Sequence, residues 1–242
     1  MKMVAERLIK PTSGEILYDG IDKNDIAIVY NENENTTLLN NYEYLMFYGK
    51  CYGVNKEEIK NRIEYYLLKY NIYNLKHVSY DDLSKSKKKI INLLSVLIAD
   101  TKVVILDEIY KDVFIKDKDI IKTMLMELIK TRTVIATCDA LDDYIDMASK
   151  IAIIDKGTIS ICGDAKDALV QYGYKEYLEV YYEGEIEDVV SLLRDMDNIK
   201  DYTYDDKKIN IVTYDFGRDH EILKVLIDHD INITSFKREE KR

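Results

Sequence analysis

The sequence has few of the residues that build metal centres or disulfide frameworks. Its 242 residues include three cysteines, Cys51, Cys138 and Cys162, and three histidines. The cysteines are far apart and form no Cys-x-x-Cys pair, so neither a zinc site nor a disulfide framework is expected, and a reducing compartment fits. The three histidines are too dispersed to predict a metal cluster.

The sequence also lacks a long hydrophobic run and an excess of basic residues. No run of about 18 apolar residues occurs, so we expect no segment that spans a membrane. The N-terminus, MKMVAER, has no long apolar core of a signal peptide. With 45 acidic and 35 basic residues, the chain carries a net charge of −10. This balance argues against nucleic acid as a general partner, because phosphate binding needs a basic face.

The most informative stretch is the run of aliphatic residues from Val103 to Leu106, which leads directly into Asp107 and Glu108. An uninterrupted apolar run is typical of a strand buried on both faces of a parallel sheet. The two carboxylates then lie at the carboxyl end of the strand, where open α/β sheets place their ligands. Taken alone, the run favours a buried strand that ends in acids over a metal-binding or catalytic pair.

Strands alternate with helices over residues 1–172, which predicts a layered α/β domain. The expected strands are residues 15–18, 26–30, 103–106, 133–137, 151–155 and 158–161, and the expected helices are residues 1–9, 40–50, 55–70, 85–99, 117–130 and 140–148. Residues 175–242 predict the order strand, helix, strand, strand, helix, strand, which is the βαββαβ order of a ferredoxin-like α+β domain. That domain carries no chemical motif, so we expect an accessory packing or regulatory module.

Three blocks of the sequence resemble, in the same order, the ATP-binding cassette of ABC transporters. The first, from Leu8 to Gly20, reads LIKPTSGEILYDG and is similar to the stretch after the phosphate-binding helix. The second, from Leu83 to Glu108, resembles the signature helix and the Walker B strand that follows it. The third, from Thr133 to Asp164, resembles the switch region and the hairpin after it. The C-terminal unit is similar to the accessory domain of some exporter-type cassettes.

The resemblance implies a P-loop NTPase-like fold and the function of an ATP-binding subunit. Such a cassette binds ATP and Mg²⁺, pairs with another cassette as a homo- or heterodimer, and couples ATP binding and hydrolysis to transport by transmembrane permease subunits. It is cytoplasmic and peripheral on the inner face of the membrane. The resemblance assigns Mg²⁺ binding to Asp107 and the general base to Glu108. It places the glutamine-loop position at Asn31, the signature serine at Ser84 and the switch histidine at Cys138.

The chain departs from the family pattern at the phosphate-binding loop. The motif Gly-x-x-x-x-Gly-Lys-Ser/Thr is absent, and the nine glycines are scattered. That loop supplies the backbone N–H groups and the lysine that hold the phosphates. Alignment on the first block places Met1 just after the motif, so the first strands of the cassette are also expected to be missing. We expect one of them to lie beside Val103–Leu106, so that its loss leaves this strand as an uncovered edge.

The other departures fall on side chains that handle nucleotide. The signature motif reads LSKSK from Leu83 to Lys87, and we expect its lysines to form a solvated helix start, with attraction of an anion as the alternative. Phe114 replaces an aspartate that couples the two sites. Cys138 replaces the histidine, and a thiol is a weak hydrogen-bond donor. We therefore expect impaired or absent hydrolysis by this chain alone. The alternative is a non-catalytic regulatory protein, or a decayed cassette, with no nucleotide role.

Overall fold

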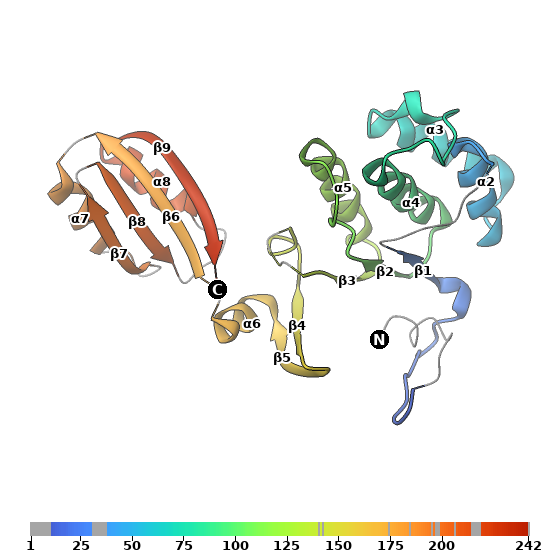
Figure 1. Cartoon of the computed structure of the whole chain (residues 1–242), viewed down its shortest axis with the longest axis horizontal. Helices are drawn as coiled ribbons and strands as arrows, with labels where there is room; N and C mark the ends of the chain where they lie inside the picture. The colour runs from blue at the N-terminus through green and yellow to red at the C-terminus, as the bar shows by residue number, and fades with distance from the viewer. Residues whose placement is uncertain are drawn as a thin grey trace. The chain divides into compact units, whose positions relative to one another are not determined.

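The computed structural model describes residues 11–30, 38–139, 141, 143–173, 175–183, 185–194, 196, 199–205, 207–213 and 219–241 (Figure 1). The chain divides into two compact units, Met1–Ala140 and Leu141–Arg242, and each is described by itself. Among the helices described, none has the length and apolarity needed to cross a bilayer. The expected domain boundary between residues 172 and 175 falls inside the second unit and stays a prediction.

The first unit is built on a three-stranded parallel sheet. Its strands are β1 (Ile26–Val29), β2 (Val103–Asp107) and β3 (Thr133–Thr137), in the spatial order β1-β2-β3. The expectation that β2 would be an uncovered edge is therefore wrong, because a parallel strand is hydrogen-bonded to each of its sides. The three middle residues of β2 are buried, in keeping with its apolar sequence.

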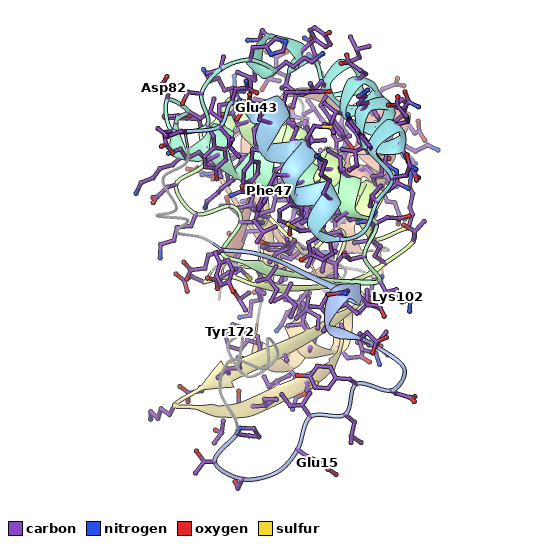
Figure 2. All side chains as sticks on the ribbon, turned by 90° about the vertical axis from the view of Figure 1, so that its right-hand side faces the viewer. Glu15, Glu43, Phe47, Asp82, Lys102 and Tyr172 are labelled. Carbon is purple, nitrogen blue, oxygen red and sulfur yellow. The ribbon has the colours of Figure 1, made fainter. Side chains whose placement is uncertain are left out.

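The helices of the first unit lie around one buried helix. They are α2 (Asn41–Cys51), α3 (Lys56–Lys69), α4 (Lys85–Ala99) and α5 (Ile115–Leu128), with short 3-10 helices η1 (Lys23–Asp25) and η2 (Tyr73–Leu75). Every residue of α4 from Lys89 to Ala99 is buried, and α4 contacts α2, α3, α5 and β1. In Figure 2, α2 lies at the front of this unit, with Glu43 and Phe47 on its outer side. Helix α4 is therefore the centre of the core.

Polar side chains mark where these helices begin. The Asn40 side chain accepts a hydrogen bond from the Glu43 N–H, and the Asn40 N–H donates to the Glu43 carboxylate, which forms a capping box before α2. Asn55 caps α3 in a similar way, as its sequence position predicts. Ser84 caps α4, because its hydroxyl oxygen accepts a hydrogen bond from the Lys87 N–H at 3.3 Å.

Two arginines hold the carboxyl end of α4. The helix ends at Asp100, which has a left-handed backbone with φ 57°. Arg62 donates to the Ile98 carbonyl and Arg132 to the Val96 carbonyl, each at 2.8 Å. Both guanidinium groups also lie 3.2 Å from the Asp100 carboxylate. The last carbonyls of a helix have no hydrogen-bond partner within the helix. Here Arg62 of α3 and Arg132, the residue before β3, donate to two of them.

Two expected elements are wrong. Residues 15–18 form no strand, and the described residues between Leu141 and Ser149 form turns in place of the expected helix. Segments this short depend on tertiary partners more than on their own pattern, since a helix of fewer than about 12 residues is marginal alone. The helix expected over residues 1–9 lies outside the described residues.

The second unit begins with a β-hairpin. Its strands are β4 (Lys150–Asp155) and β5 (Thr158–Asp164), and helix α6 (Ala165–Tyr172) follows. Lys156 and Gly157 join the strands with φ of 46° and 81°, the left-handed pair that tight hairpins require. Ile151 of the hairpin packs against Ala168 and Leu169 of α6. The sequence predicted the hairpin but not α6.

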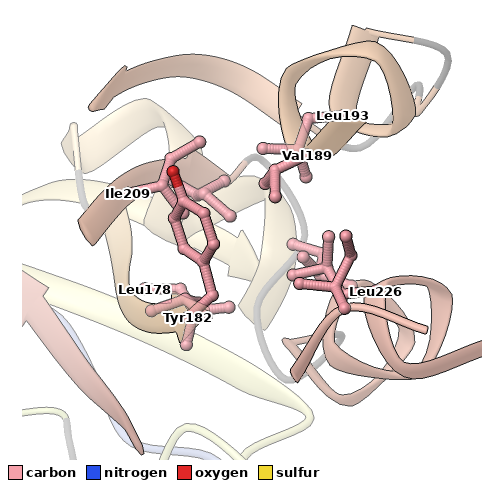
Figure 3. Close-up of a cluster of buried hydrophobic side chains, with 10 residues drawn as sticks. Leu178, Tyr182, Val189, Leu193, Ile209 and Leu226 are labelled. Atoms are coloured by element: carbon pink, nitrogen blue, oxygen red, sulfur yellow. The ribbon is translucent and has the colours of Figure 1, made fainter. Parts of the chain in front are cut away.

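A four-stranded antiparallel sheet forms the rest of the second unit. The elements are β6 (Lys175–Glu183), α7 (Ile186–Arg194), β7 (Ile199–Asp205), β8 (Lys208–Thr213), α8 (Asp219–Asp228) and β9 (Asn232–Lys241). The strand order is β7-β8-β6-β9. Side chains from one face of the sheet meet side chains of both helices, as Figure 3 shows for Leu178, Tyr182, Val189, Leu193, Ile209 and Leu226.

Candidate functional site

The carboxyl ends of β2 and β3 bring polar groups together at one edge of the parallel sheet. The Thr137 hydroxyl, at the end of β3, donates to Asp107 Oδ1, at the end of β2, over 3.0 Å. The Glu108 N–H donates to the Thr137 carbonyl, also at 3.0 Å, so the ladder continues one residue beyond β2. Cys138 follows Thr137 directly and is half-buried. Asp107, Glu108 and Cys138 therefore belong to one strand-end region.

The Glu108 carboxylate is paired with a lysine of the turn that follows it. Lys111 Nζ lies 2.8 Å from Glu108 Oε2, and this hydrogen bond raises the pKa of Lys111 above its ordinary value. Glu108 itself has φ 44°, in the left-handed region that few residues with side chains adopt. The backbone turns sharply after β2, so the Lys111 side chain lies beside the side chain of Glu108, three residues earlier in the sequence.

A buried lysine from α4 holds the same turn from the other side. Lys89 is only 2% exposed, and its ammonium group donates to the Glu108 carbonyl at 3.0 Å and to the Lys111 carbonyl. Burial lowers the pKa of Lys89, because the charged form loses its hydration. The expectation of a solvated lysine cluster at the start of α4 is wrong for this residue, since its stem reaches inward to the turn.

The first turn of α4 is also directed into the protein. The buried Ser86 donates its hydroxyl to Asp117 Oδ2 at 2.5 Å, and Lys87 Nζ lies 2.8 Å from Asp117 Oδ1. Burial alone would raise the pKa of Asp117, but the hydrogen bonds from Lys87 and Ser86 hold it below its usual value. Lys85 is exposed, and its ammonium group lies 3.9 Å from the Asp112 carboxylate. Lys85 therefore agrees best with the prediction that the lysines at the start of α4 are solvated.

Comparisons with known proteins find relatives that are ATP-binding proteins of ABC transporters. No family model matches the chain. The chain is 28% identical over 138 residues to an uncharacterised ABC transporter ATP-binding protein of Methanocaldococcus jannaschii, a match that covers 57% of this chain and 53% of that protein. It is 24% identical over 222 residues to the linearmycin resistance ATP-binding protein LnrL of Bacillus subtilis, covering 90% and 71% of the two chains.

Solved structures show the same fold. The cbiO1 subunit from Clostridium perfringens, described as part of an ABC transporter complex, superposes with a TM-score of 0.59 at 22% identity, covering 81% of this chain and 78% of that one. An ATP-binding subunit of an ABC transporter gives a TM-score of 0.62 at 17% identity, covering 71% and 75%. The curated relatives and the solved structures that this chain resembles are ATP-binding proteins of ABC transporters. The match covers about half the length of the first of these relatives, at 53%.

The structure describes most of the residues that the resemblance singles out. Asp107 ends β2 and Glu108 follows it, and Ser84 is the N-cap of α4. Cys138 follows the neighbouring strand. Asn31 lies outside the described residues. Phe114 precedes α5, where it is 57% exposed and makes no capping hydrogen bond.

Three residues at this site were not anticipated from the sequence. Lys111 follows Glu108 by three positions, and this spacing would predict their ion pair if a turn were expected there. Asp117 lies in the first turn of α5, where acids are common. Its local sequence therefore gave no indication that it pairs with Ser86 and Lys87 in the first turn of α4. Thr137 gave no signal beyond its place at a strand end.

Among the residues that the structure describes, the side chains at this strand end do not form a complete site for a magnesium-bound triphosphate. Within the described part of the chain, no group of three or more His, Cys, Asp and Glu side chains is arranged to hold a metal ion. The Glu108 carboxylate faces Lys111, and Lys87 and Lys89 are turned inward. A contact of about 4 Å between a phosphate and one of these carboxylates costs roughly 1 kcal/mol in water and more when partly buried.

Proposed function

We propose that this chain is a cassette subunit of an ABC transporter that does not hydrolyse ATP by itself. Its job would be to pair with another cassette and to couple the state of that pair to transmembrane permease subunits. The proposal includes a cytoplasmic location, peripheral on the inner face of the membrane. Support for the family role comes from relatives that are ABC transporter ATP-binding proteins.

The observation that carries the proposal is the state of Glu108. A general base must present a free carboxylate to the reacting water. Here the carboxylate accepts a hydrogen bond from Lys111, and Lys89 fixes the backbone of the same residue. The inward direction of Ser86 and Lys87 supports the same conclusion for the signature turn, because neither group is presented to an external phosphate.

The remaining site assignments are part of the proposal. Asp107 occupies the position of the Mg²⁺ ligand, Glu108 that of the base, and Ser84 that of the signature serine. Asn31 and Cys138 occupy the glutamine-loop and switch-histidine positions, where the shorter amide and the thiol are poor replacements. ATP and Mg²⁺ would then be held mainly by residues of the partner cassette.

The domain plan is also proposed. We assign residues 1–172 to a cassette without its first strands and phosphate loop, and residues 175–242 to a ferredoxin-like accessory domain. The antiparallel order β7-β8-β6-β9, with α7 and α8 on one face, supports the second assignment.

Turnover of Mg-ATP by the purified chain tests the proposal. We expect no phosphate release above that of Glu108→Gln, which keeps the shape of the side chain and removes its basicity. Turnover by the chain alone that disappears in Glu108→Gln would refute the proposal. Affinity purification from the native cell gives the second readout. Recovery of a permease together with an intact cassette supports the partner role, whereas a chain recovered without either favours a non-catalytic protein outside transport.

A further inference from the structure

The four-stranded sheet of the second unit carries a hollow that the site described above does not include. Its volume is about 330 Å³, at the lower end of the range of about 300–1,000 Å³ that is usual for small-molecule sites. The hollow lies over β6, β8 and β7, which are neighbours in the sheet (Figure 1). Its lining includes Lys175, Tyr177, Lys200, Asp201, Asn210 and Val212.

The alternation of side chains along a strand explains the apolar part of the hollow. Leu178 and Ile211 are buried against α7 and α8, on the helix-covered face of the sheet. Tyr177 and Val212 are their neighbours in sequence, so these two side chains belong to the opposite face. They are also direct cross-strand partners in the antiparallel pairing of β6 with β8. A tyrosine ring and a valine side chain therefore lie next to each other in the hollow.

A bulge in β7 places a lysine at the hollow. Ile199 pairs with Thr213 and Asp201 pairs with Val212, so Lys200 is an extra residue between two consecutive pairs. An extra residue of this kind bends its strand and changes the direction of a side chain. Here the extra residue lines the hollow, and Asp201 stands directly across from Val212.

The polar groups of the hollow are two ammonium groups, one carboxylate and one amide. Asp201 Oδ1 accepts a hydrogen bond from the N–H of Tyr202 at 2.9 Å, which uses part of its capacity. The Lys175 side chain makes no hydrogen bond or ion pair with a residue that the structure describes. On the same sheet, Lys208 differs, because its ammonium group lies 2.9 Å from the Glu179 carboxylate. The charge of Lys175 is thus available to a ligand.

We propose that this hollow binds a small aromatic monocarboxylate. The aromatic ring of the ligand packs on Tyr177 and Val212, and the ligand carboxylate lies beside the ammonium groups of Lys175 and Lys200. Asp201 favours a ligand with a single negative charge, because a second one would be repelled by its carboxylate. The net charge of −10 disfavours a nucleic-acid chain as the ligand.

Titration of the full chain in the absence of nucleotide tests the proposal, so its outcome is separate from that of the ATP assay. The probe is the naphthoate ion, which has one carboxylate and an aromatic ring system. Its neutral amide, naphthamide, has the same rings without the charge, and inorganic phosphate has the charge without the rings. NMR signals of isotope-labelled valine methyl groups report binding, and Val212→Ile assigns the signals of Val212.

We expect naphthoate to shift the Val212 signals in a saturable way. Naphthamide and phosphate should each bind at least about tenfold more weakly, because each lacks one of the two contacts. No saturable shift at millimolar naphthoate would overturn the proposal. Equal affinities for naphthoate and naphthamide, or for naphthoate and phosphate, would do the same.

Substitution of the lysines tests where the carboxylate lies. Lys175→Met and Lys200→Met should each weaken the binding of naphthoate by about fivefold or more and leave the binding of naphthamide unchanged. The matched control is Lys224→Met, because Lys224 is exposed on α8, outside the hollow, and its substitution removes the same charge. If both lysine variants bind naphthoate as tightly as Lys224→Met does, the proposal is wrong.

Substitution of the tyrosine tests where the ring lies. Tyr177→Leu removes the aromatic surface at a half-buried position and should weaken naphthoate and naphthamide by similar factors. Unchanged circular dichroism shows that each variant is folded. Affinities of Tyr177→Leu equal to those of the parent would show that the probe does not pack on this ring, which overturns the proposed site.

Discussion

Lys89→Met removes the ammonium group that holds the turn after β2 and retains most of the apolar stem. In the parent protein this ammonium donates to the carbonyls of Glu108 and Lys111 from a position that is 2% exposed. Hydrogen bonds from a charged donor contribute about 1.5–3 kcal/mol each. Burial of the ammonium also costs free energy, because the group loses its hydration on folding, and Lys89→Met avoids that cost. We expect a net loss of about 1–3 kcal/mol.

For a chain of this length, 1 kcal/mol corresponds to about 2–4 °C in Tm, so the expected decrease is roughly 4–8 °C at the middle of the range. Differential scanning calorimetry measures the shift, and hydrogen exchange of the backbone N–H groups in residues 108–112 shows whether the turn itself loosens. Lys85→Met is the matched control, since Lys85 lies on the same helix and is largely exposed. A Lys89→Met variant as stable as Lys85→Met would show that the clamp contributes nothing.

The pKa of Lys89 adds a dependence on pH to the same experiment. Burial lowers this pKa below its ordinary value of 10.5, so between the folded pKa and 10.5 the unfolded chain binds more protons than the folded one. Stability should therefore rise with pH across that interval. Lys89→Met should lack this part of the rise, and an identical pH profile for parent and variant would contradict the assignment.

Three further changes test other contacts of the first unit. Asp117→Asn should cost about 1–3 kcal/mol in urea denaturation, because it leaves Lys87 without its carboxylate. The pKa of Asp117 is lowered in the folded state, so its contribution to stability is present above the ordinary value of 3.8 and is lost as pH falls through the folded pKa. The variant should therefore lose less stability than the parent over that pH range. Lys111→Met should leave Tm unchanged in differential scanning calorimetry, because its ion pair with Glu108 is partly exposed. Arg132→Met should accelerate hydrogen exchange in the last turn of α4, where its guanidinium group satisfies two carbonyls.

The sequence predicted the elements with strong local patterns. The apolar run before Asp107 predicted a buried strand with acids at its carboxyl end, and that strand is present. The alternating and amphipathic patterns after residue 174 predicted the order of the last six elements. These predictions succeed because each depends on the residues of one segment.

The failures concern partners that are distant in the sequence. The position of β2 between β1 and β3 depends on strands about seventy and thirty residues away, and no pattern within β2 contains that information. Lys89 and Lys85 belong to one basic run, yet only Lys89 is buried, because the turn after β2 offers it two carbonyls. Lysine side chains reach far enough that the local sequence does not decide whether the charge meets water or protein.

The contact between Ser86 and Asp117 has a consequence for evolutionary reversal. The family motif has glycine at position 86, but Ser86→Gly would here remove the hydroxyl donor from a buried carboxylate. The return of glycine would therefore be harmful unless Asp117 changed as well, and Asp117→Asn in turn would leave Lys87 unpaired. Ser86, Lys87 and Asp117 therefore form one contact group on two helices, and a change at one of them alters the surroundings of the other two. We expect Ser86→Gly alone to lower stability.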